Sequence, residues 1–500
     1  TSATTLDTYN TAVGFNAGLT VTTGVQNTIV GGLAGDALTT GQRNIAFGYG
    51  ALSTDTTGQY SVAIGYGALQ NQNFTGGQAS YNVAVGYDAG NDITTGDMNT
   101  LMGALTGDAL TTGSRNTVVG ILALSAEDTG SRNTAFGYAA LGALNYDGNG
   151  YNVAIGYSAG LAMTTGIHNT LIGGLAGDAL TTGIANVAVG YQALTDEEAN
   201  GNNTALGYRS LKTLNAGADA ANTAVGYNSG AAMTTGLYNT LVGGNAGSSI
   251  TEGGGNTIMG LNAGDAITTG SSNTAIGQEA LSAEDEHGLN TAIGFQALKV
   301  QNAGANANNT AVGYRSGYAV TTGTNNTLIG GLAGDALTTG EGNVAVGDGS
   351  LGDETTGGNN VAIGKNAMNS SQLSQHNVAI GNNALVNVTN GSLKNTYNIG
   401  IGSEAGNDIT IGERNVLVGA FSGDAITEGL YNVAIGYQAL SANVDSDSNV
   451  AIGYSALSLM TGTAGNTYNT AIGHQAGLSV TTGVRNTIIR LQLFKFKHNW

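Results

Sequence analysis

The sequence predicts an all-β fold, a parallel β-solenoid (β-roll) of about 28 coils with a 17-residue period. Three observations support this prediction. A short motif, Asn followed by Thr or Val, two apolar residues and Gly, begins 28 copies of one repeat. Most copies are 17 residues long and the others 19 to 21, and so short and constant a period is typical of a solenoid. The chain also lacks Pro, as suits strand ladders that need every backbone N–H.

The strand of each copy predicts a partner chain. With the Asn numbered zero, in most copies position +2 is Ala, Leu, Ile or Val and position +3 is Val, Ile, Phe or Met, as at Ala12 and Val13. Neighbours in a strand point to opposite faces, so both faces should be buried. A thin coil has one interior, so we expect further copies of the chain to cover the second face in a homotrimer. End-to-end stacking of such solenoids is a further expectation.

The rest of the copy predicts turns and a second strand. Position +4 is Gly in 27 of the 28 copies, with Arg490 as the exception, which indicates a sharp bend or a closely approached backbone. A second apolar point follows at +11, for example Leu38, and then Thr-Thr-Gly. The β-branched pair favours extension and the Gly supplies the return turn, so we expect two short strands per coil.

The Asn at position zero is interpreted as scaffold. Stacked coils lie ~4.8 Å apart, so identical side-chain amides can hydrogen-bond up the stack. In 27 copies the first residue is Asn, and Ser61 replaces it once. The first members of this ladder are Asn10, Asn27, Asn44, Asn82, Asn99 and Asn116.

The spacing divides the chain into a lead-in (1–9), a repeat solenoid (10–489) and a non-repeat tail or cap (490–500). Longer copies divide the solenoid into blocks that start at residues 10, 82, 152, 222, 309, 398 and 469. The extra residues should form surface loops, and we expect these to make any ligand contact of this segment. The loops are 70–78, 144–150, 212–220, 299–307 and 386–394.

Composition argues against several functions. Lys and Arg number 14 against 33 Asp and Glu, so the net charge of −19 would repel nucleic acid. No run approaches the ~18 apolar residues of a membrane span, so we expect no membrane insertion. There is no Cys, and the five His lie in different coils without metal-binding spacing. We therefore expect no metal and no cofactor.

The acidic residues are interpreted as structural. An Asp recurs in Gly-Asp-Ala-Leu/Ile, where stabilising a turn is a simpler role than binding calcium. Its positions are Asp36, Asp108, Asp178, Asp265, Asp335 and Asp424. The clusters 127–128, 196–198 and 284–286 look like solvated loops, without two rigidly held carboxylates for glycoside hydrolysis. The chain is therefore not expected to be an enzyme.

Tyrosines recur at position +5 and allow two interpretations. Their rings can stack between neighbouring coils, or they can contact glycans on the surface of the solenoid. The candidate glycan contacts are Tyr49, Tyr66, Tyr87, Tyr157, Tyr191 and Tyr227.

The opening motif Asn-Val-Ala-Ile-Gly-Tyr, at 152–157 and 432–437, resembles two groups of proteins. One is the repeat shaft of phage tail fibre and tail spike proteins; the other is the β-roll head of trimeric autotransporter adhesins. The second resemblance implies a left-handed roll and a homotrimer. The 17-residue coil is longer than that family's, and we expect no heptad stalk, membrane anchor or chaperone domain within these 500 residues.

The expected function is structural: an elongated extracellular fibre, such as a virion tail fibre, that reaches and attaches to a host surface, with a surface glycan as a possible partner. The alternative is a bacterial cell-surface adhesin or extracellular filament subunit. Two minor alternatives are a glycan-degrading tail spike and an ice-binding solenoid, but Glu252, Ile411 and Glu428 interrupt the Thr rows that ice binding needs.

Overall fold

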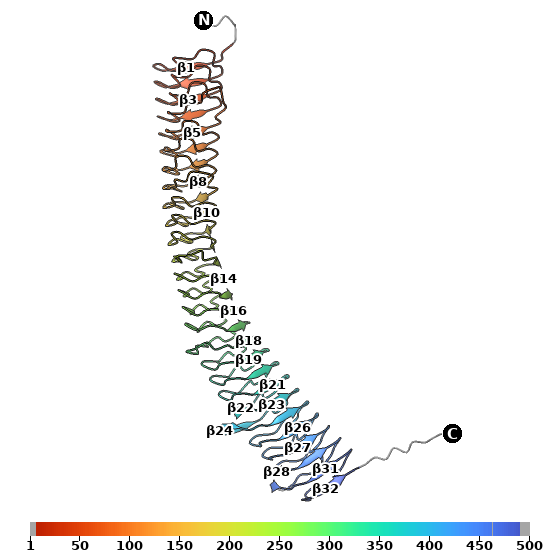
Figure 1. Cartoon of the computed structure of the whole chain (residues 1–500). Helices are drawn as coiled ribbons and strands as arrows, with labels where there is room; N and C mark the ends of the chain where they lie inside the picture. The colour runs from red at the N-terminus through yellow and green to blue at the C-terminus, as the bar shows by residue number, and fades with distance from the viewer. Residues whose placement is uncertain (1–6, 463, 491–500) are drawn as a thin grey trace, which may run out of the picture. The chain divides into compact units, whose positions relative to one another are not determined.

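The computed structural model describes residues 7–462 and 464–490. The predicted tail (490–500) and His498 therefore lie outside the described residues, apart from Arg490. The chain forms two compact units, Thr1–Gly254 and Gly255–Trp500. Each is a stack of coils with one short strand per coil (Figure 1), so the prediction of a parallel β-solenoid with about 28 turns and a 17-residue period is confirmed. No described segment is a helix, and hence no helix there is long enough to cross a membrane.

The first unit contains 14 three-residue strands. They pair in parallel with no register shift, so that Ala154 lies beside Leu171 and Ile155 beside Ile172. The strands are β1 (Thr11–Val13), β2 (Thr28–Val30), β3 (Ile45–Phe47), β4 (Val62–Ile64), β5 (Val83–Val85), β6 (Thr100–Met102), β7 (Thr117–Val119), β8 (Thr134–Phe136), β9 (Val153–Ile155), β10 (Thr170–Ile172), β11 (Val187–Val189), β12 (Thr204–Leu206), β13 (Thr223–Val225) and β14 (Thr240–Val242).

The second unit repeats this arrangement and adds two small parallel pairs. Its main strands are β15 (Thr257–Met259), β16 (Thr274–Ile276), β17 (Thr291–Ile293), β18 (Thr310–Val312), β19 (Thr327–Ile329), β20 (Val344–Val346), β21 (Val361–Ile363), β23 (Val378–Ile380), β25 (Ile399–Ile401), β26 (Val416–Val418), β27 (Val433–Ile435), β29 (Val450–Ile452), β31 (Thr470–Ile472) and β32 (Thr487–Ile489). The additional pairs are β22 (Gln372–Gln375) with β24 (Thr389–Asn395), and β28 (Ser446–Asp447) with β30 (Gly465–Asn466).

The second strand expected in every coil is absent from most of the described coils. At Thr-Thr-Gly the N–H groups of Thr22, Thr23 and Gly24 all donate to the carbonyl oxygen of Thr39, at 2.9, 3.3 and 3.2 Å. Three successive donors that share one acceptor curl the backbone around that oxygen, whereas a ladder needs alternating donors and acceptors. The prediction of two strands per coil was therefore wrong for the regular coils.

Large side chains of some coils pack into space that Gly residues leave in the same and the preceding coil. Position +2 is buried throughout most of the stack, and in the second coil of a block it is large, as at Leu171. A Cβ on Gly160 would lie 2.8 Å from Leu171 Cδ1, and one on Gly177 would lie 2.9 Å from Leu171 Cδ2. The Gly residues at +8 in these coils therefore leave the space that this Leu side chain fills.

The Gly at +4 is required by backbone contact between coils. Gly156 has a φ of 144°, and a Cβ there would lie 2.4 Å from the carbonyl oxygen of Gly173. Gly173 makes the same approach to Gly190. A side chain at this position would thus meet both a strained φ and the backbone of the next coil.

The Asn column connects the coils through the expected bonds between side-chain amides and also through the backbone. Asn169 Nδ2 donates to Asn152 Oδ1 at 3.4 Å, and Asn377 Nδ2 donates to Asn360 Oδ1 at 3.1 Å. Asn152 Oδ1 accepts a hydrogen bond from the backbone N–H of Asn169 (3.0 Å), and Asn152 Nδ2 donates to the carbonyl of Gly166 in its own coil (2.9 Å). An Asn of this kind joins its strand to the next coil and to its own return turn.

Asn133 and Asn203 instead donate to the carbonyl group two residues before them. Where Ser61 replaces Asn, Gln72 Nε2 donates to Ser61 Oγ (2.7 Å) and Gln72 Oε1 accepts from Asn82 (2.9 Å).

The outward strand face stays uncovered within the chain. Position +3 is half-exposed in many coils, for example Phe47 (54%), Met102 (45%) and Phe136 (53%). The residue before each of them, at +2, is fully buried. The chain by itself thus buries one of the two faces that the sequence argument expected to be buried.

Candidate functional site

Two columns of aromatic side chains flank the strands. At +5 the rings stack from coil to coil: Tyr138 on Tyr157 at 5.4 Å, and Tyr191 on Tyr208 at 5.7 Å between centroids. At −1, Tyr60 stacks on Tyr81 at 5.2 Å. The in-register coils place equivalent residues one above the other, so the rings meet face to face.

Stacking between coils determines which of the candidate tyrosines has a ring face open to a ligand. Tyr66 lies between Tyr49 (5.4 Å) and Tyr87 (5.5 Å), so both of its faces are covered. Tyr49, Tyr87 and Tyr157 each have one ring neighbour in the column. The same is true of Tyr191 and Tyr227, whose common neighbour is Tyr208. A sugar face can therefore stack only where a run of rings ends.

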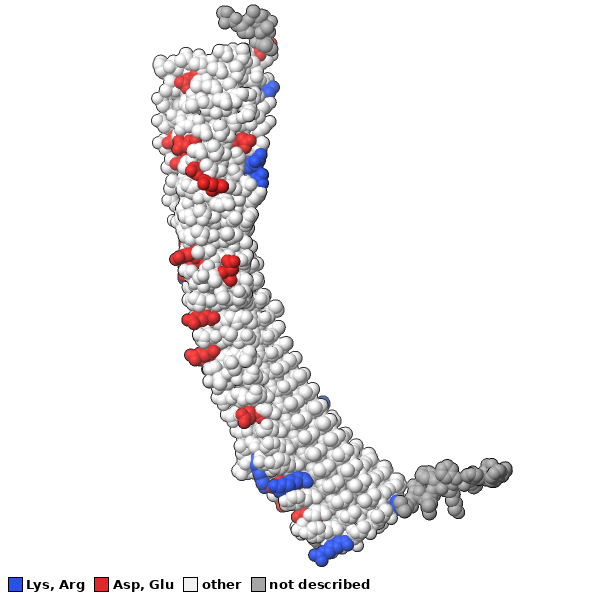
Figure 2. All heavy atoms as spheres, in the orientation of Figure 1, with Lys and Arg blue, Asp and Glu red and all other residues white. Residues whose placement is uncertain are grey.

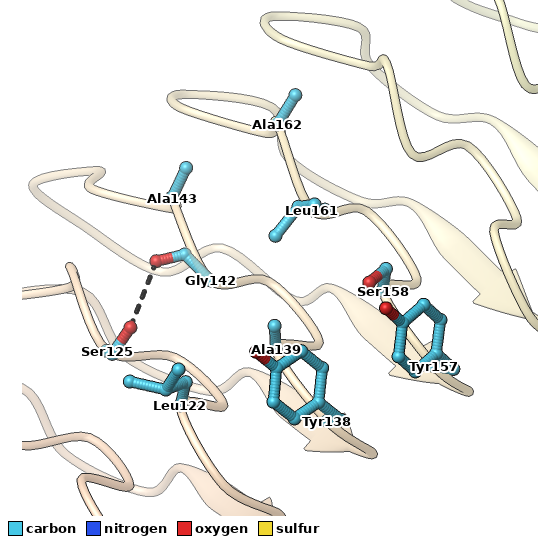
Figure 3. Close-up of a pocket in the computed structure, with 10 residues that line it drawn as sticks. All are labelled: Leu122, Ser125, Tyr138, Ala139, Gly142, Ala143, Tyr157, Ser158, Leu161 and Ala162. Atoms are coloured by element: carbon cyan, nitrogen blue, oxygen red, sulfur yellow. Dashed lines mark hydrogen bonds between the residues drawn. The ribbon is translucent and has the colours of Figure 1, made fainter.

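A groove of about 630 Å³ lies beside one of these runs (Figure 3). The rings of Tyr138 and Tyr157 line one side, and Leu122 and Leu161 line it from the neighbouring turns. Its other side is formed by small residues at +9 and +10: Ser125, Gly142, Ala143 and Ala162. Aromatic and apolar walls with few polar groups are typical of ligand sites.

The groove has few polar contacts of its own. Ser125 Oγ donates to the carbonyl of Gly142 at 3.4 Å, shown as the dashed line in Figure 3. On the face seen in Figure 2, charged side chains are sparse and most of the surface is uncharged.

The sequence predicted that the acidic clusters are solvated loops, and this is wrong for one Glu in each cluster. Glu127, Glu197 and Glu284 are fully buried, whereas Asp196 and Glu198 are exposed. The buried residues occupy position +11, where regular copies carry Leu or Ile. The spacing from Asn to Glu was the signal that could have revealed this burial.

These carboxylates bind the backbone of two coils. Glu127 Oε1 accepts from Gly130 N (2.7 Å) and Oε2 from Tyr146 N (3.2 Å), the latter in the insertion of the next coil. Glu354 likewise accepts from Gly357 N (2.7 Å) and Leu373 N (2.9 Å). Desolvation by burial raises the pKa of Glu127 to about 7, although the hydrogen bonds oppose this shift. Carboxylates held in this way are occupied by structural hydrogen bonds.

The recurrent Asp at +9 is half-buried, and its carboxylate accepts a hydrogen bond from its own backbone in Asp108, Asp178 and Asp424. Oδ1 is buried without a hydrogen-bond partner in Asp36, Asp108, Asp178, Asp265 and Asp424. Desolvation by burial, the largest cause, raises the pKa of Asp424 to about 6.

Most of the histidines belong to the aromatic columns. His168 stacks on Tyr151, His376 on Tyr397 and His474 on Tyr454. His287 instead has Nδ1 3.6 Å from Glu284 Oε1. With Asp285, these two form the one group in residues 7–462 and 464–490 whose metal-binding atoms all lie within 4.8 Å of one another.

No known family model matches this chain. No curated protein matches it either. Its function must therefore be argued from the geometry described above.

Proposed function

We infer that the protein is a structural fibre: a left-handed solenoid that assembles as a homotrimer, extends from a virion or a cell surface, and mediates attachment to a host surface. The observation that carries this proposal is the outward strand face. Its +3 column is apolar in coil after coil, and this chain does not cover it.

Burial of this column would favour association. An apolar side chain that is about half-exposed gains roughly 1 kcal/mol when a partner covers it. Because the column repeats along the strands of each unit, many such contributions can outweigh the cost of association. A second copy presents the same column at the same spacing, whereas an unrelated partner would need to match it.

The buried carboxylates support a structural function over a catalytic one. Glu127 and Glu354 are fully buried and accept backbone hydrogen bonds at both oxygens or at several donors. A general acid or nucleophile must instead reach a substrate. Depolymerisation of host polysaccharide that is lost in Glu127→Gln would contradict this part of the proposal.

Light scattering on the intact chain tests the assembly. We expect three times the chain mass, and a loss of the trimer when four consecutive +3 residues become Asp. These residues are Phe136, Ile155, Ile172 and Val189. The matched control makes the exposed insertion residue Asn145 into Asp. A monodisperse wild-type monomer would refute the trimer.

A further inference from the structure

The +5 aromatic column is interrupted by single glycines in the first unit. Gly174 lies between the coils of Tyr157 and Tyr191, and Gly32 lies between those of Phe15 and Tyr49. Each flanking ring is exposed, with 61% of Tyr157 and 47% of Tyr191 accessible. We call these two places the ring slots.

The backbone of each slot points the missing side chain at a ring. A Cβ on Gly174 would lie 3.5 Å from Tyr191 Cδ2, and a Cβ on Gly32 would lie 3.3 Å from Tyr49 Cδ2. Neither Gly has a left-handed φ, so the backbone would accept a side chain. The slots are therefore positions from which one ring of a regular stack is missing.

The slot height selects the thickness of an occupant. Tyr157 and Tyr191 lie two coils apart. Stacked coils are ~4.8 Å apart, so about 10 Å separates the two ring positions. A flat aromatic group in contact with both rings needs only ~7 Å, at 3.5 Å per contact. A saturated six-membered ring is thicker, since its axial hydrogens stand off both faces, and so fills the gap better.

We propose that the two ring slots bind neutral pyranose sugars, each held with one face on either aromatic ring. The proposal rests on the attachment function inferred above and identifies where that function meets a glycan. Figure 3 shows Tyr157 on the wall of the groove, so the ring that closes one end of the groove also closes the Gly174 slot. The Tyr157 side chain therefore belongs to both the groove and the slot.

Charge excludes acidic sugars. Asp178 follows Gly174 in the same coil at +9, the position whose members line the groove in neighbouring coils, and its side chain is half-buried. A carboxylate at this position repels uronic and sialic acids. The chain's net charge of −19 acts in the same direction.

Saturation-transfer NMR on the full chain tests the proposal. The probes are the methyl pyranosides of glucose, galactose, mannose and N-acetylglucosamine. Methyl glucuronide, phenol and tetramethylammonium are tested in the same way, as examples of acidic, aromatic and cationic ligands. The double variant Gly32→Tyr/Gly174→Tyr fills both slots with the side chain used at other +5 positions. Gly391→Tyr is the matched control, because a Cβ at Gly391 meets nothing within 4 Å.

We expect transfer to the ring protons of at least one neutral pyranoside, reduced about tenfold by the double variant and unchanged by Gly391→Tyr. No transfer to any neutral pyranoside would overturn the proposal, as would transfer that survives filling of both slots. Slot-dependent binding of phenol or tetramethylammonium in place of the pyranosides would assign the slots to aromatic or cationic groups. Light scattering reads the trimer separately, so these outcomes leave the assembly proposal intact.

Discussion

Glu127 should make its part of the solenoid more stable in mild acid than at neutral pH. The side chain is fully buried, and its carboxylate receives backbone N–H groups from Gly130 and Tyr146. Desolvation raises its pKa from 4.5 to about 7, and the neighbouring charge of Asp128 adds to this. Burial therefore disfavours the ionised form more than the two hydrogen bonds favour it.

The sign of the pH dependence follows from linkage. The folded state holds the proton more tightly than the unfolded state, in which the pKa is near 4.5. The stabilisation is fully present below pH 4.5 and is lost as the pH rises through about 7. A shift of this size corresponds to at most about 3 kcal/mol, or roughly two orders of magnitude in the local opening equilibrium.

Hydrogen-exchange mass spectrometry of peptides covering 127–150 measures this locally, after correction for intrinsic exchange rates. A local readout is needed because desolvation also raises the pKa of Asp55, Glu197 and Glu284. In the wild type we expect greater protection at pH 5 than at pH 8. In Glu127→Gln, which cannot ionise, that difference should vanish from these peptides and persist around Glu197. Equal protection at both pH values, or an unchanged difference in Glu127→Gln, would refute the reasoning.

Three further predictions concern stability and the columns. Asn152→Ala should lower the free energy of local unfolding by about 3 kcal/mol, because Asn169 N and Gly166 O lose buried partners; the exposed Asn145→Ala is the control, and equal exchange protection in both would contradict this. Gly156→Ala should cost at least about 2 kcal/mol in chemical denaturation, since its Cβ would lie 2.4 Å from Gly173 O, whereas Gly391→Ala should change little. Tyr66→Ala should not reduce pyranoside transfer at the Gly174 slot, because Tyr66 belongs to another run of rings; a loss there would show that the NMR signal has a different origin.

The sequence could predict the coil itself, because each coil meets an almost identical neighbour. Asn at zero, an apolar residue at +2 and Gly at +4 recur at one spacing, and in-register stacking converts that spacing directly into contacts between equivalent positions. Gly156 is an example: its need for a positive φ and a bare backbone follows from the neighbouring Gly173, which is the same position in the next copy. For such residues the neighbour in the folded protein is the equivalent residue of the next copy, so it can be read from the sequence.

Residues that depart from the repeat needed the tertiary structure. Glu127 looked like part of a solvated acidic cluster. Its spacing from Asn116 already placed it at the position of a core Leu, but its hydrogen bond with Tyr146 N in the next coil is seen only in the structure. The Thr-Thr-Gly segment has the composition of a strand, but its N–H groups converge on one carbonyl. Tyr66 and Tyr157 are alike in sequence, yet the first has both faces covered and the second has one open beside Gly174. Composition and period determine the coil. The burial of the Glu127 carboxylate, the sharing of one carbonyl by three N–H groups and the stacking of each Tyr ring depend on which two coils lie side by side.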